Sequence, residues 1–370
     1  FAGNKTAQGN QDGNDIGDFY YTPPTGFLAL CTKNLPDVAV TPSEHFNTVL
    51  YTGNATARSI TGVGFQPDFV WIKDRSFSEW HILNDVVRGA GQSLYSNSTD
   101  AEGGPNYFVS SFDSDGFTVN VTPNVGANKN GDSYVAWCWK AGGTAVTNTD
   151  GTITSQVSAN VDAGFSIVSW TSDGSSSNGV GHGLSETPTF FIYKTRNSVA
   201  PWYVWTTLID GSNDQLLLND TNSKGDIVGY GSPSSTTISN YGFGSGVELI
   251  AYCFHSVEGF SKFGSYVGNG STNGAFVYTG FKPAFVMVKR TDSTANWNIW
   301  DKERSDYHPT NDLLQPDSSA AEYVNLTAWD IDLVSNGFKV RGTNQQVNAS
   351  GGTYIYMAFA ESPTKFSLGR

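Results

Sequence analysis

Carboxylates and histidines are the side chains of this 370-residue sequence that could do chemistry. A glycosidase places two carboxylates across a cleft, but no spacing marks a pair among the candidates Glu79, Asp85, Glu102, Asp301 and Glu303. The nucleophile motif of a catalytic triad, Gly-x-Ser-x-Gly, is missing although histidines are available at His81, His182, His255 and His308. Metalloprotease, phosphate-loop and dinucleotide motifs are missing too. We therefore expect no enzymatic activity and no cofactor.

One acidic stretch, Asp113-Ser-Asp-Gly116, resembles part of a calcium loop, because hard cations take clustered oxygen ligands. The distal glutamate of such a loop is absent, and a second copy of the stretch reads Val334-Ser-Asn-Gly337. Asp, Asn and Gly are also typical of a tight turn between strands. We expect a plain turn and no metal site.

Three tryptophans follow a stretch that the chain uses three times, at residues 64–75, 186–196 and 280–290. They are Trp80, Trp202 and Trp297, which lie 13, 14 and 14 residues after Pro67, Pro188 and Pro283. The face of a tryptophan can bind the C–H face of a pyranose, but a residue that recurs in every copy is more typical of a core. We expect all three to be buried.

Aromatic residues that do not recur are better ligand candidates, because the repeated fold does not require them. We single out Tyr230, Tyr241, Tyr307 and Trp329. Each copy of the stretch also ends in charged residues, namely Asp74-Arg75, Lys194–Arg196 and Lys289-Arg290. These could bind an anionic sugar or a neighbouring subunit. We expect instead a strand end that turns into solvent, or an arginine paired with a nearby carboxylate.

The composition favours short strands joined by turns, since aromatic residues make up 14% of the chain and 41 residues are glycine. A net charge of −13 argues against nucleic acid as a partner, because binding it needs a basic surface. No apolar run approaches about 18 residues, so we expect no membrane insertion. Cys138 and Cys253 occupy equivalent repeat positions where the third copy has Ala358, which is typical of small buried residues.

Strand and turn signals predict an all-β fold of tandem antiparallel β-sandwich modules with a jelly-roll-like pattern. The first and last strands of each module are both strongly apolar, so their pairing would close the sandwich. The expected parts are an N-terminal arm (1–45), module 1 (46–142), a linker (143–160), module 2 (161–258) and module 3 (259–370). Module 2 has diverged most. Recognition is expected where the copies differ, at 171–183, 222–247 and 306–329.

Module 1 resembles a module that is repeated in structural proteins of tailed bacteriophages, notably marine phages. The motifs are Gly64-Phe-Gln-Pro-Asp-Phe-Val-Trp-Ile-Lys73, Val87-Arg-Gly89, Ser111-Phe-Asp-Ser-Asp-Gly-Phe117 and Tyr134-Val-Ala-Trp-Cys-Trp-Lys140. Module 3 keeps parts of them and module 2 matches weakly. Residues 21–36, with a short apolar strand expected at 26–31, are similar to the C-terminal end of a concanavalin-like (lectin or SPRY type) sandwich, so 1–45 is expected to hold its remnant.

The resemblance implies a non-enzymatic virion structural protein, a fibre or spike appendage that contacts glycan on the host surface. It also implies a homo-oligomer, usually a trimer, with other virion proteins as partners. The protein would be assembled in the host cytoplasm and would end on the extracellular particle, where many weak loop contacts gain avidity. Two alternatives stay open: a capsid-decorating or purely architectural protein, and a polysaccharide-degrading enzyme with sugar-binding modules.

Overall fold

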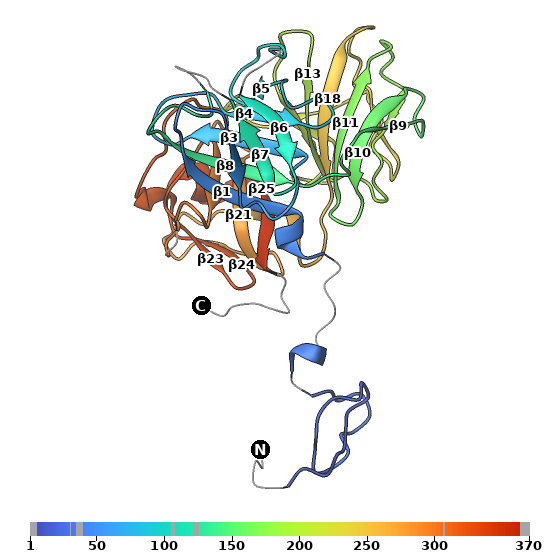
Figure 1. The fold of residues 1–370 in the computed structure, drawn as a ribbon, viewed down its shortest axis with the longest axis vertical. Coiled ribbons are helices and arrows are strands. Elements are labelled where there is room, and N and C mark those ends of the chain that lie inside the picture. The colour runs from blue at the N-terminus through green and yellow to red at the C-terminus, as the bar shows by residue number, and fades with distance from the viewer. Residues whose placement is uncertain are drawn as a thin grey trace.

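A computed structural model describes residues 6–29, 31–34, 40–104, 108–120, 126–305 and 308–362. The expected all-β architecture of antiparallel sandwich modules is confirmed. Figure 1 shows a body of packed sheets from which an N-terminal segment extends. Among the described residues the helices are short: η1 (Thr32–Asn34), η2 (Pro42–Glu44), η3 (Thr327–Trp329) and α1 (Gln345–Asn348).

Each module contributes one large antiparallel sheet built on the same four-strand order. In module 1 the order is β1 (Phe46–Thr52), β8 (Ser133–Trp139), β3 (Phe69–Asp74) and β4 (Ile82–Asp85). In module 2 it is β11 (Phe165–Thr171), β18 (Glu248–Phe254), β13 (Phe190–Thr195) and β14 (Tyr203–Thr206). In module 3 it is β19 (Ser261–Val267), β25 (Thr353–Ser362), β21 (Lys282–Arg290) and β22 (Trp297–Asp301). The first and last strands pair in every module, as predicted.

A smaller sheet packs against the outer face of each large one. These sheets are β2 (Arg58–Thr61), β7 (Gly116–Val119) and β6 (Val109–Asp113); β12 (Gly179–Gly181) and β17 (Thr237–Ser239); and β20 (Phe276–Tyr278), β24 (Gly337–Val340) and β23 (Ile331–Val334). The calcium-like stretch is the turn between β6 and β7, as expected. The Asp113 carboxylate accepts hydrogen bonds there from the Ser59, Ser111 and Thr118 hydroxyls.

The large sheets are apolar on both faces because both faces are covered. In β8, Val135, Trp137 and Trp139 point to a central core, whereas Tyr134, Ala136 and Cys138 point to the small sheet of module 1. Cys138, Cys253 and Ala358 take matching places in β8, β18 and β25, and all three are fully buried. This confirms the interpretation of the two cysteines as small core residues.

The central core is shared by all three modules, so the sandwiches are not separate bodies in a row. Aromatic rings join them in pairs: Phe69 to Tyr252 (4.3 Å between ring centroids), Phe46 to Phe359 (4.9 Å) and Phe254 to Phe359 (6.1 Å). The prediction of tandem modules is thereby refined. Three sheets pack with their inner faces against one another, and three outer cores lie behind them.

Residues 143–160, which were expected to be a linker, are half strand and belong to the sheet of module 2. They contain β9 (Val146–Asn148) and β10 (Ser155–Asn160), which extend the sheet of module 2 beyond β11. Ser155 and Ser158 are buried in β10, which pairs with β11 on one side and with the edge strand β9 on the other. The opposite edges are extended by β5 (Leu94–Tyr95) in module 1 and by β15 (Asp214–Leu217) and β16 (Gly225–Asp226) in module 2.

The N-terminal segment, residues 6–29 and 31–34, is a loop that ends in η1 and is organised by Asp12. Its carboxylate accepts hydrogen bonds from the backbone of Asn14, Ile16 and Ala29 and from the Asn34 amide. These bonds, the one from Ala29 foremost, lower the pKa of Asp12 to about 2. The strand expected at 26–31 is not formed in the described residues 26–29 and 31. No helix in the described part of the chain is long and apolar enough to cross a membrane.

Candidate functional site

A segment after the fourth strand of each large sheet crosses to the neighbouring module. We call residues 95–102, 217–224 and 315–322 the crossing segments of modules 1, 2 and 3. The same backbone bond recurs at each junction: Ala200 N to Thr99 O (3.0 Å), Ala295 N to Thr221 O (2.9 Å) and Glu79 N to Ser319 O (2.9 Å). Module 1 thus contacts module 2, module 2 contacts module 3, and module 3 contacts module 1. The contacts close the modules into a ring.

A buried lysine receives each crossing segment. Lys194, Lys289 and Lys73 donate to the same three carbonyls, Thr99 O (3.1 Å), Thr221 O (2.8 Å) and Ser319 O (3.2 Å). Burial lowers the pKa of each lysine to about 8. The expectation that these strand ends turn into solvent is therefore wrong for the lysines. An ammonium fixed inside a junction is also unavailable to an anionic ligand.

A buried ring fixes the start of each fourth strand. Trp202 and Trp297 donate from Nε1 to Tyr95 O and Leu217 O of the preceding crossing segments, both at 2.8 Å. Their counterpart in module 1 is His81, which is fully buried and accepts from Trp71 Nε1 at 3.0 Å. Trp80, predicted to be core, is 44% exposed. The spacing in the sequence indicates this equivalence, since His81, not Trp80, lies 14 residues after Pro67.

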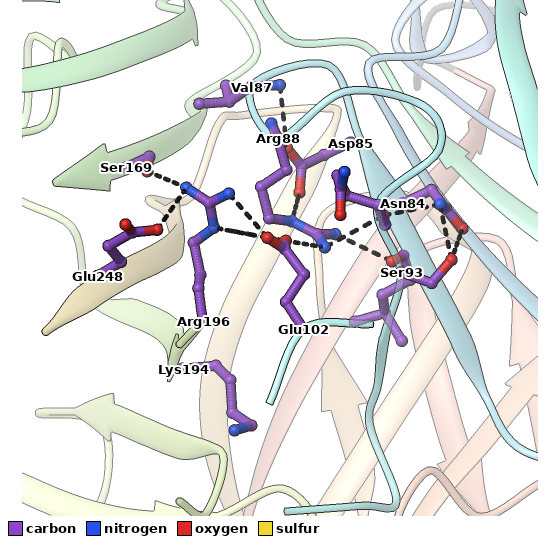
Figure 2. Close-up of polar contacts among 12 residues, drawn as sticks. Asn84, Asp85, Val87, Arg88, Ser93, Glu102, Ser169, Lys194, Arg196 and Glu248 are labelled. Atoms are coloured by element: carbon purple, nitrogen blue, oxygen red, sulfur yellow. Dashed lines mark hydrogen bonds and ion pairs between the residues drawn. The ribbon is translucent and has the colours of Figure 1, made fainter. Parts of the chain in front are cut away.

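Figure 2 shows a chain of ion pairs where the crossing segment of module 1 meets module 2. Arg88 lies between Asp85 (Nε to Oδ2, 2.5 Å) and Glu102 (Nη1 to Oε1, 3.0 Å), and Glu102 continues to Arg196 of module 2 (2.8 Å). The side chains of Asp85 and Arg88 are fully buried. The Tyr252 hydroxyl of module 2 donates to Asp85 Oδ2 (2.8 Å), so the buried charges have polar partners from both modules.

The junction of module 3 with module 1 repeats this chain. Arg304 pairs with Asp301 (2.6 Å) and Glu322 (2.8 Å), and Glu322 pairs with Arg75 of module 1 (2.7 Å). Trp137 of module 1 donates from Nε1 to Asp301 Oδ2 (2.9 Å). Arg75 and Arg196 are therefore paired with carboxylates, as expected.

The junction of module 2 with module 3 has the opposite arrangement of charge. Lys224 stands where Glu102 and Glu322 stand, since its N–H donates to Thr291 O (2.9 Å) as that of Glu102 donates to Arg196 O. Asp210 precedes Gly211 as Arg88 precedes Gly89, and it pairs with Lys224 (2.6 Å). Thr291 takes the place of the receiving arginine. The ion pair of this segment is thus reversed in sign and stays within module 2.

Lys224 binds two further carboxylates, Asp214 (2.7 Å) and Asp226 (2.9 Å). The hydrogen bonds with Asp210, Asp214 and Asp226 raise the pKa of Lys224, and the bond with Lys224 lowers the pKa of Asp210. Burial raises the pKa of Asp214, whose side chain is fully covered. One oxygen from each carboxylate lies within 4.8 Å of the others, as in a metal site. The ammonium is bonded to all three carboxylates, so the cluster contains its own cation.

A pocket of about 400 Å³ opens beside this cluster. Its wall combines polar and apolar side chains from β15, the crossing segment, β16 and the following loop: Gln215, Leu216, Leu217, Asn222, Ser223, Lys224, Gly225, Asp226, Ile227, Val228 and Tyr230. Tyr230 is 39% exposed, and its ring lies 5.8 Å from that of the buried Tyr241. An open aromatic ring beside amide, carboxylate and ammonium groups can bind a polar ligand that carries C–H faces.

Comparison with known proteins places most of the chain in one family. Residues 41–363 match the family described as Domain of unknown function (DUF7483). The chain belongs to the DUF7483 family. No curated protein and no solved structure matches it. The DUF7483 match begins before β1 and ends after β25, so it covers the whole three-module ring.

The aromatic candidates fall in different environments of the DUF7483 fold. Tyr230 lines the pocket. Tyr241 is only 7% exposed and stacks on Tyr193 (5.1 Å), so its face is unavailable and its selection as a binding residue is wrong. Trp329 is half-buried in η3 against the outer core of module 3. Tyr307 lies outside the described residues.

The carboxylates considered for catalysis are all ion-paired: Glu79 with Lys129, Asp85 and Glu102 with Arg88, Asp301 with Arg304, and Glu303 with Lys302. Two of them, Asp85 and Asp301, are fully buried. Asp85, Glu102 and Asp301 belong to the ion-pair chains at the junctions, whereas Glu303 pairs with its exposed neighbour Lys302.

The crossing segments were missed at the level of sequence, although they share a short pattern. Residues 97–102, 219–224 and 317–322 read Asn-Ser-Thr-Asp-Ala-Glu, Asn-Asp-Thr-Asn-Ser-Lys and Asp-Ser-Ser-Ala-Ala-Glu. The first residue caps the ring-bearing strand, since Asn97, Asn219 and Asp317 accept from the backbone N–H of His81, Trp202 and Trp297. The third supplies the carbonyl for the lysine, and the sixth supplies the charge.

Proposed function

We propose that this DUF7483 chain is a non-enzymatic structural protein of a bacteriophage virion, an appendage that binds glycan on the host surface through the pocket of module 2. The observation that carries the proposal is the pocket around Tyr230, which lies within a stretch where module 2 departs from the other two. The likeness of module 1 to phage structural modules supports the virion part. The ion pairing of the candidate catalytic carboxylates supports a role other than catalysis.

The pocket suits a saccharide in size and chemistry. Its volume of about 400 Å³ lies in the range of small-ligand sites. Gln215, Asn222 and Asp226 offer amide and carboxylate groups to sugar hydroxyls, and the Tyr230 ring offers a face to sugar C–H groups. A homo-oligomeric appendage, with a trimer as the proposed form, would present several such pockets and bind with avidity.

The test is binding of the purified chain to an array of bacterial capsular polysaccharides and lipopolysaccharides. Tyr230→Ala is expected to weaken binding about tenfold, equivalent to about 1.4 kcal/mol, and Tyr230→Phe much less. Phe276→Ala is the control, because Phe276 is also exposed (49%) but lies on β20 of module 3. Equal binding by Tyr230→Ala would reject the pocket. Release of reducing ends from any polysaccharide on the array would favour the enzyme alternative.

A purely architectural virion protein is the second candidate, and the N-terminal segment favours it. Tyr21 (74% exposed), Phe27 (69%) and Leu28 (48%) present apolar surface on a segment that extends from the body (Figure 1). Such residues are typical of contacts with another protein. Imaging of labelled chain on intact particles would show it on the head or on the tail. A head location together with no glycan binding would favour this candidate.

A further inference from the structure

Trp80 is the exception among the tryptophans of the ring. All ten tryptophans lie in the described residues; eight are buried, Trp329 is half-buried, and Trp80 alone is 44% exposed. A tryptophan at the surface leaves a large apolar area in water, so it needs an explanation that the core does not provide.

The repeats show that the fold does not need a tryptophan at this position. The residues that precede the buried rings of modules 2 and 3 are Pro201 and Asn296, and the buried position in module 1 is filled by His81. The chain therefore builds the same strand start three times and adds an aromatic ring to its outer side once.

The Trp80 ring is held from one side and open on the other. It packs on the Tyr95 ring (4.8 Å between centroids, 37° between planes), and Tyr95 in turn contacts the buried Phe108 (6.4 Å). The backbone on either side is fixed by Glu79 N to Ser319 O (2.9 Å) and His81 N to Asn97 Oδ1 (3.0 Å). A ring that is fixed before binding loses little conformational entropy when a ligand packs on it.

Polar residues precede Trp80 in the chain, and their side chains contact other parts of the junction. Glu79 is paired with Lys129, and both are partly exposed, with side-chain exposures of 18% and 21%. The Ser78 hydroxyl lies 3.1 Å from that of Ser319 on the crossing segment of module 3, and the ring of Phe77 is 56% exposed. Sugar hydroxyls can exchange hydrogen bonds with carboxylate, ammonium and hydroxyl groups, while the C–H face of the sugar packs on the indole.

We infer that Trp80 is a stacking platform for a neutral saccharide, a second carbohydrate site at the junction of modules 1 and 3. The inference takes its ligand class from the proposed function, but its site shares no residue with the pocket of module 2. A neutral saccharide is favoured because the charges at this surface, Glu79 and Lys129, already neutralise each other. Two sites on one ring would let a single chain hold a polysaccharide at two points.

The test uses tryptophan fluorescence, because Trp80 is the ring most open to the quencher acrylamide. Cellohexaose, maltohexaose and mannohexaose are the probes, with an alginate hexamer as the acidic comparison. A neutral probe that stacks on Trp80 should protect the indole from quenching. Trp80→Ala is expected to remove the emission that acrylamide can quench and to weaken binding of that probe at least tenfold. Val199→Ala is the matched control, because Val199 is 71% exposed and lies on the corresponding turn of module 2. It should change neither the quenching nor the binding of the probe.

The outcomes separate this inference from the proposed function. Protection that survives Tyr230→Ala but not Trp80→Ala supports the Trp80 site, whatever the pocket of module 2 does. Unchanged quenching with all three neutral probes at about 10 mM, ten times a weak dissociation constant of about 1 mM, would overturn it. Protection that instead rises with protein concentration, without sugar, would also overturn it and would assign Trp80 to contacts between copies.

Discussion

The crossing segments of modules 1 and 2 make the same backbone contacts but use charge in opposite ways. At the first junction Glu102 joins a buried arginine of its own module to an arginine of the next. At the second, Lys224 turns back to three carboxylates of its own module, and Thr291 replaces the receiving arginine. Backbone hydrogen bonds and a buried lysine are therefore enough to hold a crossing segment against the next module. Among the described residues, ion pairs between modules are an addition at two of the three junctions.

The difference also shows why the pocket lies in module 2. Glu102 and Glu322 face the next module, where each forms an ion pair with an arginine of that module. Lys224 faces its own module, and the wall that it forms with Asp226 and Tyr230 is open to solvent. In the described part of the chain no ion pair joins modules 2 and 3 at this junction, and a concave surface lies beside it.

The largest expected effect comes from breaking a buried ion-pair chain. Arg88→Met leaves the buried Asp85 carboxylate and Glu102 without their arginine, and we expect a loss of about 3–5 kcal/mol in the free energy of unfolding. Urea unfolding followed by circular dichroism measures it. Asp210→Asn is the matched variant in module 2; its pair is open to solvent, so its loss should be much smaller. Equal losses in the two variants would contradict the comparison.

Reversal of the charge in module 2 tests the second junction. Lys224→Glu places a fourth carboxylate beside Asp210, Asp214 and Asp226, and we expect a loss of about 1–3 kcal/mol. Adding Asp210→Arg rebuilds the arginine–glutamate pair of the other two junctions. The double variant should recover at least half of the free energy of unfolding that Lys224→Glu loses. A double-mutant cycle in urea gives the coupling. No coupling between the two sites would show that the sign of the pair is immaterial.

The smallest expected effect concerns Asp317, which stands where the other crossing segments have Asn97 and Asn219. Burial raises the pKa of Asp317 to about 7, so the folded chain holds a proton that the unfolded chain releases near pH 4. Stability from this group is therefore full below about pH 4 and is lost as the pH rises to about 7. Asp317→Asn should add about 1–2 kcal/mol at pH 8 and little at pH 4.

The reciprocal change provides the control for Asp317. Asn97→Asp places the same carboxylate in the segment of module 1, where the Asn97 side chain accepts from His81 N (3.0 Å). It should lower the free energy of unfolding at pH 8 and leave it closer to that of the parent chain at pH 4. Parallel stability curves for parent and variants between pH 4 and pH 8 would show that these positions do not titrate with folding.

Much of the fold could be predicted from the sequence because the repeated strands are long, apolar and bounded by turns. The pairing of first and last strands followed from their apolar character, and the exchange of Cys138, Cys253 and Ala358 identified core positions. The shared core could not be predicted. Trp137 and Ala136 are neighbours in one apolar run, and no pattern says that one faces the other modules while the other faces the small sheet.

The candidate site was predictable only in part. Tyr230 lies in a stretch marked by its divergence, but Tyr241 nearby is buried, and single-residue exposure is not readable from a Tyr/Gly-rich loop. Trp80 was misassigned because a tryptophan in each copy outweighed a one-residue difference in spacing. The buried lysines and the arginines Arg75 and Arg196 could not be assigned, since their partners on the crossing segments are 68 to 247 residues away in the chain.

The hydrogen bond between Lys73 and Ser319 can form only after most of the chain has been synthesised. The two residues are 246 positions apart, and at translation rates of about 5–20 residues per second their synthesis is separated by roughly 10–50 s. Module 1 is complete only after β8 (Ser133–Trp139) has been made, and from then until module 3 is made the part of its inner face that packs on module 3 stays uncovered. Modules 1 and 2 can lock to each other early, but the ring closes only when module 3 arrives. The nascent chain is therefore most exposed to aggregation while it is two-thirds complete.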